Sequence, residues 1–197
     1  MEIRNSRTNL QSPIKNHMTP WKKLAQKTRV PVGTVLGIVF LLLMHPSNRS
    51  LVIGITIAVA GSLLRVWAAG HIDKGKVLTQ GGPYALTRNP LYLGSFIMAL
   101  GIIIAGQGYW LLLAFGAFFA LFYFPVMRAE EQELLQSHGE QFVEYAKRVP
   151  RFFPGFRTAS PPTSTFLWSR VIRNREHHTM IGLAVAVALL LVLRFIR

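Results

Sequence analysis

The sequence contains no cysteine, which excludes disulfide bonds, thiolate metal sites and cysteine nucleophiles. Acidic residues are also scarce, because eight Asp and Glu stand against 22 Lys and Arg, a formal net charge of +14. Polar residues as a whole are few, since 51% of the 197 residues are hydrophobic. This composition argues against a purely water-soluble protein and favours one domain embedded in a lipid bilayer.

The basic residues lie in three polar stretches that alternate with apolar runs. Residues 1–30 hold seven of them, residues 71–90 hold three and residues 128–178 hold eight, and all eight acids lie in the same stretches. Nucleic-acid-binding proteins instead gather cations on one folded face that carries base-reading or stacking elements. The alternation is typical of loops between membrane spans, so we expect no nucleic-acid partner.

Five apolar runs predict an all-α membrane protein with about five transmembrane helices. A spanning helix needs about 20 apolar residues, so the first and third runs are short and need flanking side chains that snorkel. The positive-inside rule places the basic segment 1–30, and the loops 71–90 and 128–178, in the cytoplasm. Residues 31–197 then form one integral, multi-pass membrane domain, with spans at about 31–45, 51–70, 90–106, 108–127 and 179–196.

Some features refine this topology. Gly33 and Gly37 form a small-xxx-small pair that would let the first helix approach a neighbour closely, or else reflect how common glycine is in membrane helices. Arg65 lies inside the second run, where snorkelling explains it better than a functional intramembrane charge. Residues 129–148 have the pattern of a cytoplasmic amphipathic helix, and the proline-rich stretch 150–162 predicts a wrapping loop after it.

Two cytoplasmic stretches hold most of the polar side chains that suit a reaction. In the first, Asn89 and Pro90 fit the N-cap and first position of the third span, whose free amides would attract a carboxylate. In the second, Glu130 and Glu131 follow the fourth span and could hold a cationic ligand. Taken from these residues alone, a simple helix start for the first stretch and a solvated acidic helix start for the second are favoured over ligand binding.

Together the stretches resemble a known family. The blocks are GGPYALTRNPLYLG at residues 81–94 and EEQELLQSHGEQFVEYAKRVPRFFP at residues 130–154, separated by a predicted helical hairpin. In order and spacing they are similar to the isoprenylcysteine carboxyl methyltransferases and the related phospholipid N-methyltransferases. The resemblance covers roughly residues 76–156. It implies a membrane methyltransferase that uses S-adenosylmethionine as cofactor and methylates a lipophilic acceptor from the bilayer, an isoprenylcysteine carboxylate or a phospholipid amine.

The resemblance also implies which residues bind the cofactor. The segment 76–79 would line its adenosine side beside Tyr84, residues 89–92 occupy the family's His-Pro-x-Tyr positions, and Glu130 matches the glutamate that binds S-adenosylmethionine. Residues 145–154 match the segment that folds over the cofactor. The predicted cofactor-binding residues are Lys76, Val77, Leu78, Thr79, Tyr84, Asn89, Pro90, Leu91, Tyr92 and Glu130.

Three residues are predicted to act on the acceptor, and no metal is expected. Arg128 or Arg148 would orient an acceptor carboxylate, while Glu131, or alternatively His71, would deprotonate an amine acceptor. Two departures from the family pattern bear on this assignment. Asn89 replaces the usual histidine, and Val126 stands where the family often has a substrate-contacting arginine, which leaves the acceptor's identity open.

Two other functions fit parts of the sequence. A glutamate-led helix followed by a tyrosine and a proline-bounded loop also occurs in NADPH-dependent membrane sterol reductases, and the arginines of residues 128–178 could bind the nucleotide's phosphates. A non-enzymatic basic membrane protein that recruits anionic lipid would explain the charge. His177 and His178 are adjacent and lack the i, i+4 spacing of a helical metal motif. The sequence does not indicate an oligomeric state.

Overall fold

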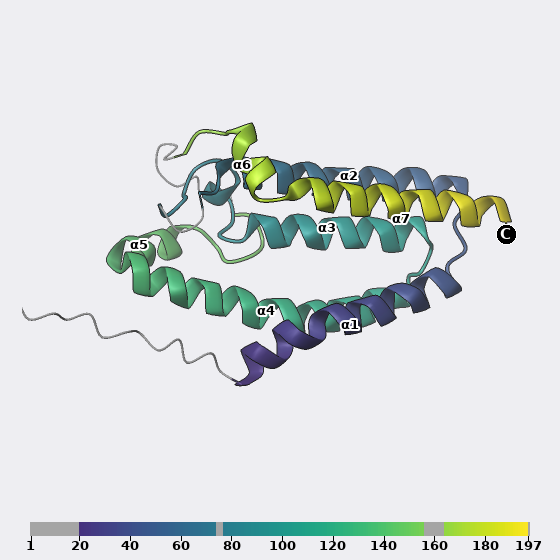
Figure 1. Cartoon of the computed structure of the whole chain (residues 1–197), viewed down its shortest axis with the longest axis horizontal. Coiled ribbons are helices and arrows are strands. Elements are labelled where there is room, and N and C mark those ends of the chain that lie inside the picture. Colours follow the sequence, from purple (N-terminus) through teal and green to yellow (C-terminus); the bar gives the residue numbers. More distant parts are fainter. Residues whose placement is uncertain (1–19, 74–76, 156–163, 197) are drawn as a thin grey trace, which may run out of the picture.

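The computed structural model describes residues 20–73, 77–155 and 164–196, and every regular element within these ranges is a helix. Long helices run lengthwise beside one another, while α5, α6 and the short 3-10 turn η1 gather at one end (Figure 1). The predicted all-α architecture is confirmed for these residues. The elements are α1 (Pro20–Leu43), α2 (Asn48–His71), η1 (Gly82–Ala85), α3 (Pro90–Ala105), α4 (Leu111–His138), α5 (Glu140–Arg148), α6 (Trp168–Arg173) and α7 (Glu176–Ile196).

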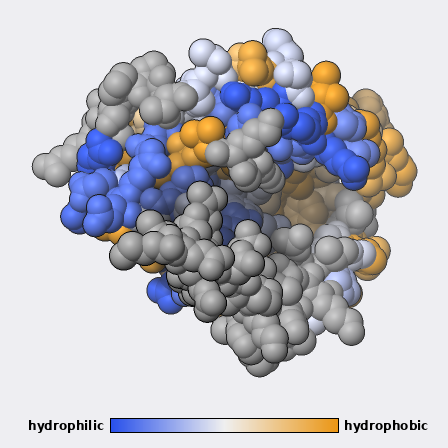
Figure 2. Space-filling view, turned by 60° about the vertical axis from the view of Figure 1, so that its left-hand side comes forward, coloured by the Kyte–Doolittle hydropathy of each residue, from blue (hydrophilic) through white to orange (hydrophobic). Residues whose placement is uncertain are grey.

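Three helices, α2, α4 and α7, are long and apolar enough to cross a membrane. The apolar parts of the other two predicted spans are shorter, Pro31–Phe40 within α1 and Pro90–Ala105 in α3. Hydrophilic side chains gather on the described part of the end that carries α5 and α6, with some hydrophobic ones among them (Figure 2). The chain is therefore built as an integral membrane protein, whereas the count of five spans and their orientation stay predictions.

Helix α1 begins at Pro20, so residues 20–30 of the predicted basic segment are helical, and the apolar part of α1 starts at Pro31. One predicted element is wrong. Residues 129–148 are not one amphipathic helix, because α4 continues to His138 and α5 starts after Gly139. Gly139 has a φ of 52°, a conformation that costs glycine little, and it lets the chain turn back there. The predicted wrapping loop is described only to Gly155.

Helices α2 and α3 pack so closely that their backbones touch. A Cβ atom on Gly54 would lie 2.4 Å from the carbonyl oxygen of Gly101, and one on Gly61 would lie 2.7 Å from that of Gly94. The close approach expected of Gly33 and Gly37 is thus found on another helix pair. At Gly37 a Cβ atom would meet no atom within 4 Å.

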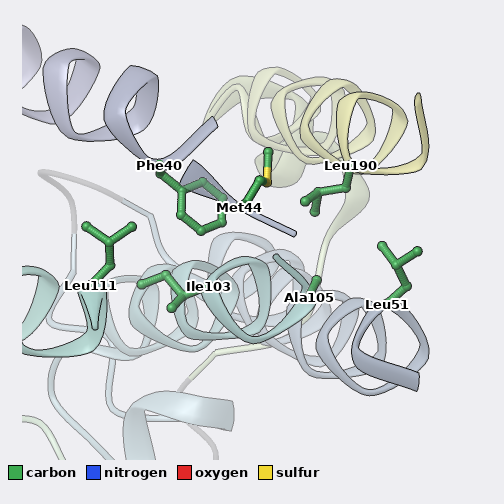
Figure 3. Close-up of a cluster of buried hydrophobic side chains, with 7 residues drawn as sticks. All are labelled: Phe40, Met44, Leu51, Ile103, Ala105, Leu111 and Leu190. Atoms are coloured by element: carbon green, nitrogen blue, oxygen red, sulfur yellow. The ribbon is translucent and has the colours of Figure 1, made fainter. Parts of the chain in front are cut away.

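An apolar core closes the end of the bundle opposite α5. Figure 3 shows Phe40 and Met44 pointing among helices that also supply Leu51, Ile103 and Leu190. The hairpin before α2 is held by a capping box and by the side chain of Ser50, whose hydroxyl donates to the carbonyl of Ala105 at 2.9 Å. The buried apolar contacts thus hold one end together and leave the polar groups at the other.

Candidate active site

The start of α3 and the end of α4 meet at the polar end of the bundle. Asn89 Nδ2 lies 3.4 Å from Glu131 Oε1, and one helical turn later the hydroxyl of Tyr92 donates to Glu130 Oε1 at 2.7 Å. The two motif blocks are far apart in sequence, yet two contacts join them. The structure therefore brings together the residues that the resemblance predicted to share one ligand.

Glu131 is the buried member of the acidic pair. Its carboxylate forms a two-pronged ion pair with Arg151, whose Nη2 and Nε lie 2.8 and 2.9 Å from Oε2, and Arg88 Nε lies 3.5 Å from Oε1. Asn89 occupies the N-cap position of α3 but makes no side-chain cap, because its amide donates to the carbonyl of Arg151 at 2.9 Å instead. Glu131 and Asn89 thus hold the loop after α5 against α3 and α4.

Glu130, by contrast, is exposed and receives the Tyr92 hydroxyl on one oxygen. Tyr92 in turn packs edge-on against Tyr123, with ring centroids 5.8 Å apart. The Glu130 carboxylate is thus accessible to a ligand while one of its oxygens is held by Tyr92. A carboxylate in this setting can accept hydrogen bonds from an ammonium group or balance a nearby cation.

Tyr84 is buried in η1, and its hydroxyl has no hydrogen-bond partner among the described residues. Burial raises the pKa of this phenol, and the charge of Glu130 is among the further causes. The Tyr145 hydroxyl donates to the Tyr84 backbone carbonyl at 2.7 Å and so holds η1 against α5. An unpaired buried hydroxyl costs free energy, which makes this atom a candidate ligand contact.

The predicted adenosine-side segment meets α5. Leu78 is buried in a cluster with Phe142, Tyr145 and Val149, whereas Val77 is exposed and Thr79 is partly buried. Lys76 lies outside the described residues. Pro90 is buried at the first position of α3, as predicted, and Leu91 contributes its backbone carbonyl to the guanidinium of Arg65.

The snorkelling predicted for Arg65 is wrong. Its guanidinium forms a two-pronged ion pair with Glu176 of α7 at 2.7 and 2.9 Å, and it also donates to Ser95. The side chain of Glu176 is only 4% exposed. The positive charge of Arg65 is therefore paired within the bundle, with the carboxylate of the first residue of α7.

Two adjoining cavities lie beside these residues. A polar cavity of about 590 Å³ is bordered by Thr34, Arg65, Tyr92 and Ser95. An apolar cavity of about 420 Å³ continues from it between α1, α3, α4 and α7. The two share Gly33, Ser95, Phe118 and Tyr123. Sequence reasoning missed the walls from α1 and α7, since those helices carry neither motif block.

The other predicted catalytic residues lie apart from these cavities. Arg128 stacks over the ring of Phe124 at 4.8 Å, and Arg148 is exposed with its Nε donating to the carbonyl of Glu144. Neither lines the cavity that holds Tyr92. The ring of His71 packs edge-on against Trp67 and Phe166, with Nδ1 2.9 Å from the carbonyl of Trp67. Among the described residues no three His, Asp or Glu side chains form a group that could hold a metal.

Comparison with known proteins finds relatives of the part of the chain that carries these residues. Residues 65–141 match the phospholipid methyltransferase family model. The nickel-cobalt-cadmium resistance protein NccN of Alcaligenes xylosoxydans xylosoxydans and the cobalt-zinc-cadmium resistance protein CzcN of Cupriavidus metallidurans are each 36% identical over 104 residues, 52% of this chain and 47 and 46% of theirs. The protein-S-isoprenylcysteine O-methyltransferase of Schizosaccharomyces pombe is 30% identical over 95 residues, 48% of this chain and 40% of its own.

The chain thus spans about half the length of the curated relatives it matches, or less. No solved structure matches it. The family match covers the segment from Arg65 through both glutamates, which includes η1, α3 and α4. Residues 65–141, which form the centre of this helical membrane protein, are thus similar to the phospholipid methyltransferase family.

Proposed function

We propose that the chain is an integral membrane methyltransferase that takes a methyl group from S-adenosylmethionine and places it on a lipophilic acceptor, with its N terminus and active site in the cytoplasm. One observation carries the proposal. Tyr92, whose hydroxyl donates to Glu130, lines a partly polar cavity that continues into a mostly apolar one between the helices. Such a site suits a reaction between a polar cofactor and an apolar substrate.

The residues present fit the predicted cofactor. When bound, S-adenosylmethionine supplies a methyl group on a positively charged sulfur. Glu130 is an exposed carboxylate that could hold the ligand's ammonium or balance its sulfonium, and Tyr84 has a hydroxyl without a partner among the described residues. Glu131, Arg151 and Asn89 keep the loop after α5 in place beside the site. These contacts would hold donor and acceptor in line, and such alignment contributes about 7 to 11 kcal/mol in well-oriented reactions.

The apolar cavity is the proposed place for the acceptor's hydrocarbon part. Its polar neighbour holds Arg65, whose charge Glu176 already neutralises, together with the hydroxyls of Tyr92 and Ser95. An acceptor carboxylate would be oriented here by hydrogen bonds, with Arg65 as the nearest cation. A base role for Glu131 toward an amine stays a prediction, although both of its oxygens contact other side chains in this conformation.

The cofactor assignment is tested by measuring S-adenosylhomocysteine affinity of the purified chain by titration calorimetry. Tyr84→Phe and Tyr92→Phe should weaken binding about tenfold or more, because each removes a hydroxyl from beside a charged ligand. Tyr109→Phe, at an exposed tyrosine on the opposite hairpin, serves as control. Unchanged affinity in the first two variants refutes the assignment. Tight binding of NADPH with none of S-adenosylhomocysteine would instead support the reductase.

The acceptor assignment is tested by filling the apolar cavity. A Cβ atom on Gly37 or Gly182 would meet nothing within 4 Å, so leucine at either position occupies cavity space without disturbing the packing. Both variants should lower the transfer of labelled methyl groups to a membrane lipid or prenylated peptide while cofactor affinity is unchanged. Gly116→Leu is the control, because Gly116 is equally open but does not line the cavity. Equal activity in all three variants contradicts the proposal.

A further inference from the structure

A separate cavity of about 480 Å³ lies between the end of α4 and α5. It shares no residue with the two cavities beside Tyr92. Four cations and one acid line it, a net charge of +3, and the neighbouring Glu144, which pairs with Lys147 at 2.8 Å, lowers this to +2. Its charged lining is Arg88, Arg128, Lys147, Arg151 and Glu131, and its apolar lining is Leu135, Phe142, Val143 and Ala146.

Aromatic rings hold the arginines of this cavity in place. The guanidinium carbons of Arg128 and Arg151 lie 4.8 and 5.4 Å from the centroid of Phe124, and that of Arg88 lies 5.9 Å from the centroid of Phe142. A ring face positions a guanidinium without neutralising its charge. The aromatic contacts therefore do not occupy the N–H groups of these side chains, although two nitrogens of Arg151 already contact Glu131.

The carboxylates at hand do not use up these donors. Glu131 pairs with Arg151 and lies 3.5 Å from Arg88, but among the described residues no carboxylate contacts Arg128. The Nε of Arg88 is buried and makes no hydrogen bond in the same part of the chain, because its nearest carboxylate oxygen, Glu131 Oε1, lies 3.5 Å away. One acid thus serves two arginines, and the cavity keeps an excess of positive charge that suits an oxyanion.

We propose that this cavity binds the phosphate of an anionic membrane phospholipid. Guanidinium groups match phosphate oxygens with paired hydrogen bonds, which a lysine or a hydroxyl cannot reproduce. The cavity lies where the apolar helix α4 becomes polar and the amphipathic α5 folds beside it, so a lipid with its headgroup here keeps its chains alongside the bundle. The apolar wall of Leu135 and Val143 suits the glycerol end of the chains rather than a free ion.

A lipid bound in this cavity would help to hold α5 against α4. Arg128 lies on α4 and Lys147 on α5, so a phosphate between them would connect the two helices on either side of the Gly139 turn. The proposal does not rest on the proposed methyl transfer, because it concerns another cavity. A failed lipid test would leave the methyltransferase assignment untouched, and the reverse also holds.

The test uses the full chain in neutral maltoside micelles, titrated with dioctanoyl phosphatidylglycerol and followed by calorimetry. Arg128→Gln should weaken binding about tenfold or more, as expected for a charge-assisted hydrogen bond. Lys147→Gln should weaken it about fivefold, the effect of one cation near a phosphate. The matched control is Arg148→Gln, which removes the same charge one residue away from a side chain outside the cavity. It should change affinity less than about twofold.

Competing ligands distinguish an anionic lipid from other possible occupants of the cavity. Dioctanoyl phosphatidylcholine and inorganic phosphate should bind at least about tenfold more weakly than phosphatidylglycerol, and saturating S-adenosylhomocysteine should leave lipid binding unchanged. If Lys147→Gln and Arg148→Gln lose lipid affinity equally, the lipid is attracted by the general surface charge, and the proposal of a specific site is overturned. Equal binding of inorganic phosphate would overturn the lipid source. Displacement by S-adenosylhomocysteine or NADPH would assign the cavity to a nucleotide ligand and overturn the proposal. Lys147 is exposed, so its variant still tests the site if Arg128→Gln fails to fold.

Discussion

Replacing Glu131 by glutamine should destabilise the fold, whereas the same change at Glu130 should mainly remove cofactor binding. The two residues are neighbours with identical side chains, but they face different surroundings. Glu131 is 7% exposed and contacts Arg151, Arg88 and Asn89, while Glu130 is exposed and contacts Tyr92. The pair therefore separates a structural role from a ligand-binding role with one chemical change.

The contacts set the expected size of the two effects. Breaking a fully buried ion pair from one side costs about 3 to 5 kcal/mol, because the remaining charge stays buried without a partner. The Arg151 side chain is 32% exposed, so solvent screening reduces the cost of Glu131→Gln to about 2 to 3 kcal/mol. Glu130→Gln keeps an acceptor for the Tyr92 hydroxyl, and we expect a loss below about 1 kcal/mol.

Thermal unfolding of the purified protein in one detergent measures both values. For a chain of this length each kcal/mol corresponds to roughly 2 to 4 °C, so Glu131→Gln should lower the midpoint by about 4 to 12 °C. Glu130→Gln should unfold near the wild-type midpoint but bind S-adenosylhomocysteine about tenfold more weakly or worse. The reasoning is refuted if Glu131→Gln unfolds like wild type, or if Glu130→Gln retains full cofactor affinity.

Three further outcomes follow from the contacts. Gly101→Ala should cost about 1 to 3 kcal/mol, since its Cβ would lie 2.4 Å from the backbone of α2, while Gly116→Ala, which meets no atom, should cost nothing measurable in the same unfolding assay. Arg65→Gln and Glu176→Gln should each destabilise, and the double variant should lose less than their sum, which a double-mutant cycle measures. Burial raises the pKa of Tyr145 above its unfolded value of about 10. Above pH 10 the phenol therefore ionises more readily in the unfolded chain than in the folded one, and the folded state loses stability as the pH rises. Tyr145→Phe should therefore flatten the alkaline fall of the unfolding midpoint between pH 9 and 11.

The sequence predicted the meeting of two helix ends well because both motif blocks lie next to helix boundaries that can be recognised. Pro90 begins α3, and the glutamates follow the apolar part of α4. The residues alone did not distinguish Glu130 from Glu131; the resemblance gave Glu130 to the cofactor and Glu131 a role toward the acceptor, and the structural role of Glu131 was not predicted. Successive residues of a helix point about 100° apart, so one faces Tyr92 and the other faces the loop after α5, and only tertiary packing decides which.

Contacts between distant segments were the other part that sequence missed. Arg65 pairs with Glu176, which is 111 residues away, and no local pattern identifies that partner. Glycine spacing was similarly ambiguous, because a Cβ atom on Gly37 of α1 would meet nothing and one on Gly33 only the ring of Phe118 at 3.6 Å, while glycines of α2 and α3 form the close contact. The residues have the same type in both places. The difference lies in which helix packs against them, and a single sequence does not show this.

These contacts also suggest how an acceptor would enter the proposed site. Helices α2 and α3 touch through glycine backbones, so they cannot separate without loss of many contacts at once. Helix α7 is held near one end by the Glu176–Arg65 ion pair and near the other by Leu190 in the apolar core, and its side chains between these points border the apolar cavity. Because α1 lines the same cavity through glycines that contact little, we expect a lipophile to pass between α1 and α7 while the α2–α3 pair holds the motif residues still.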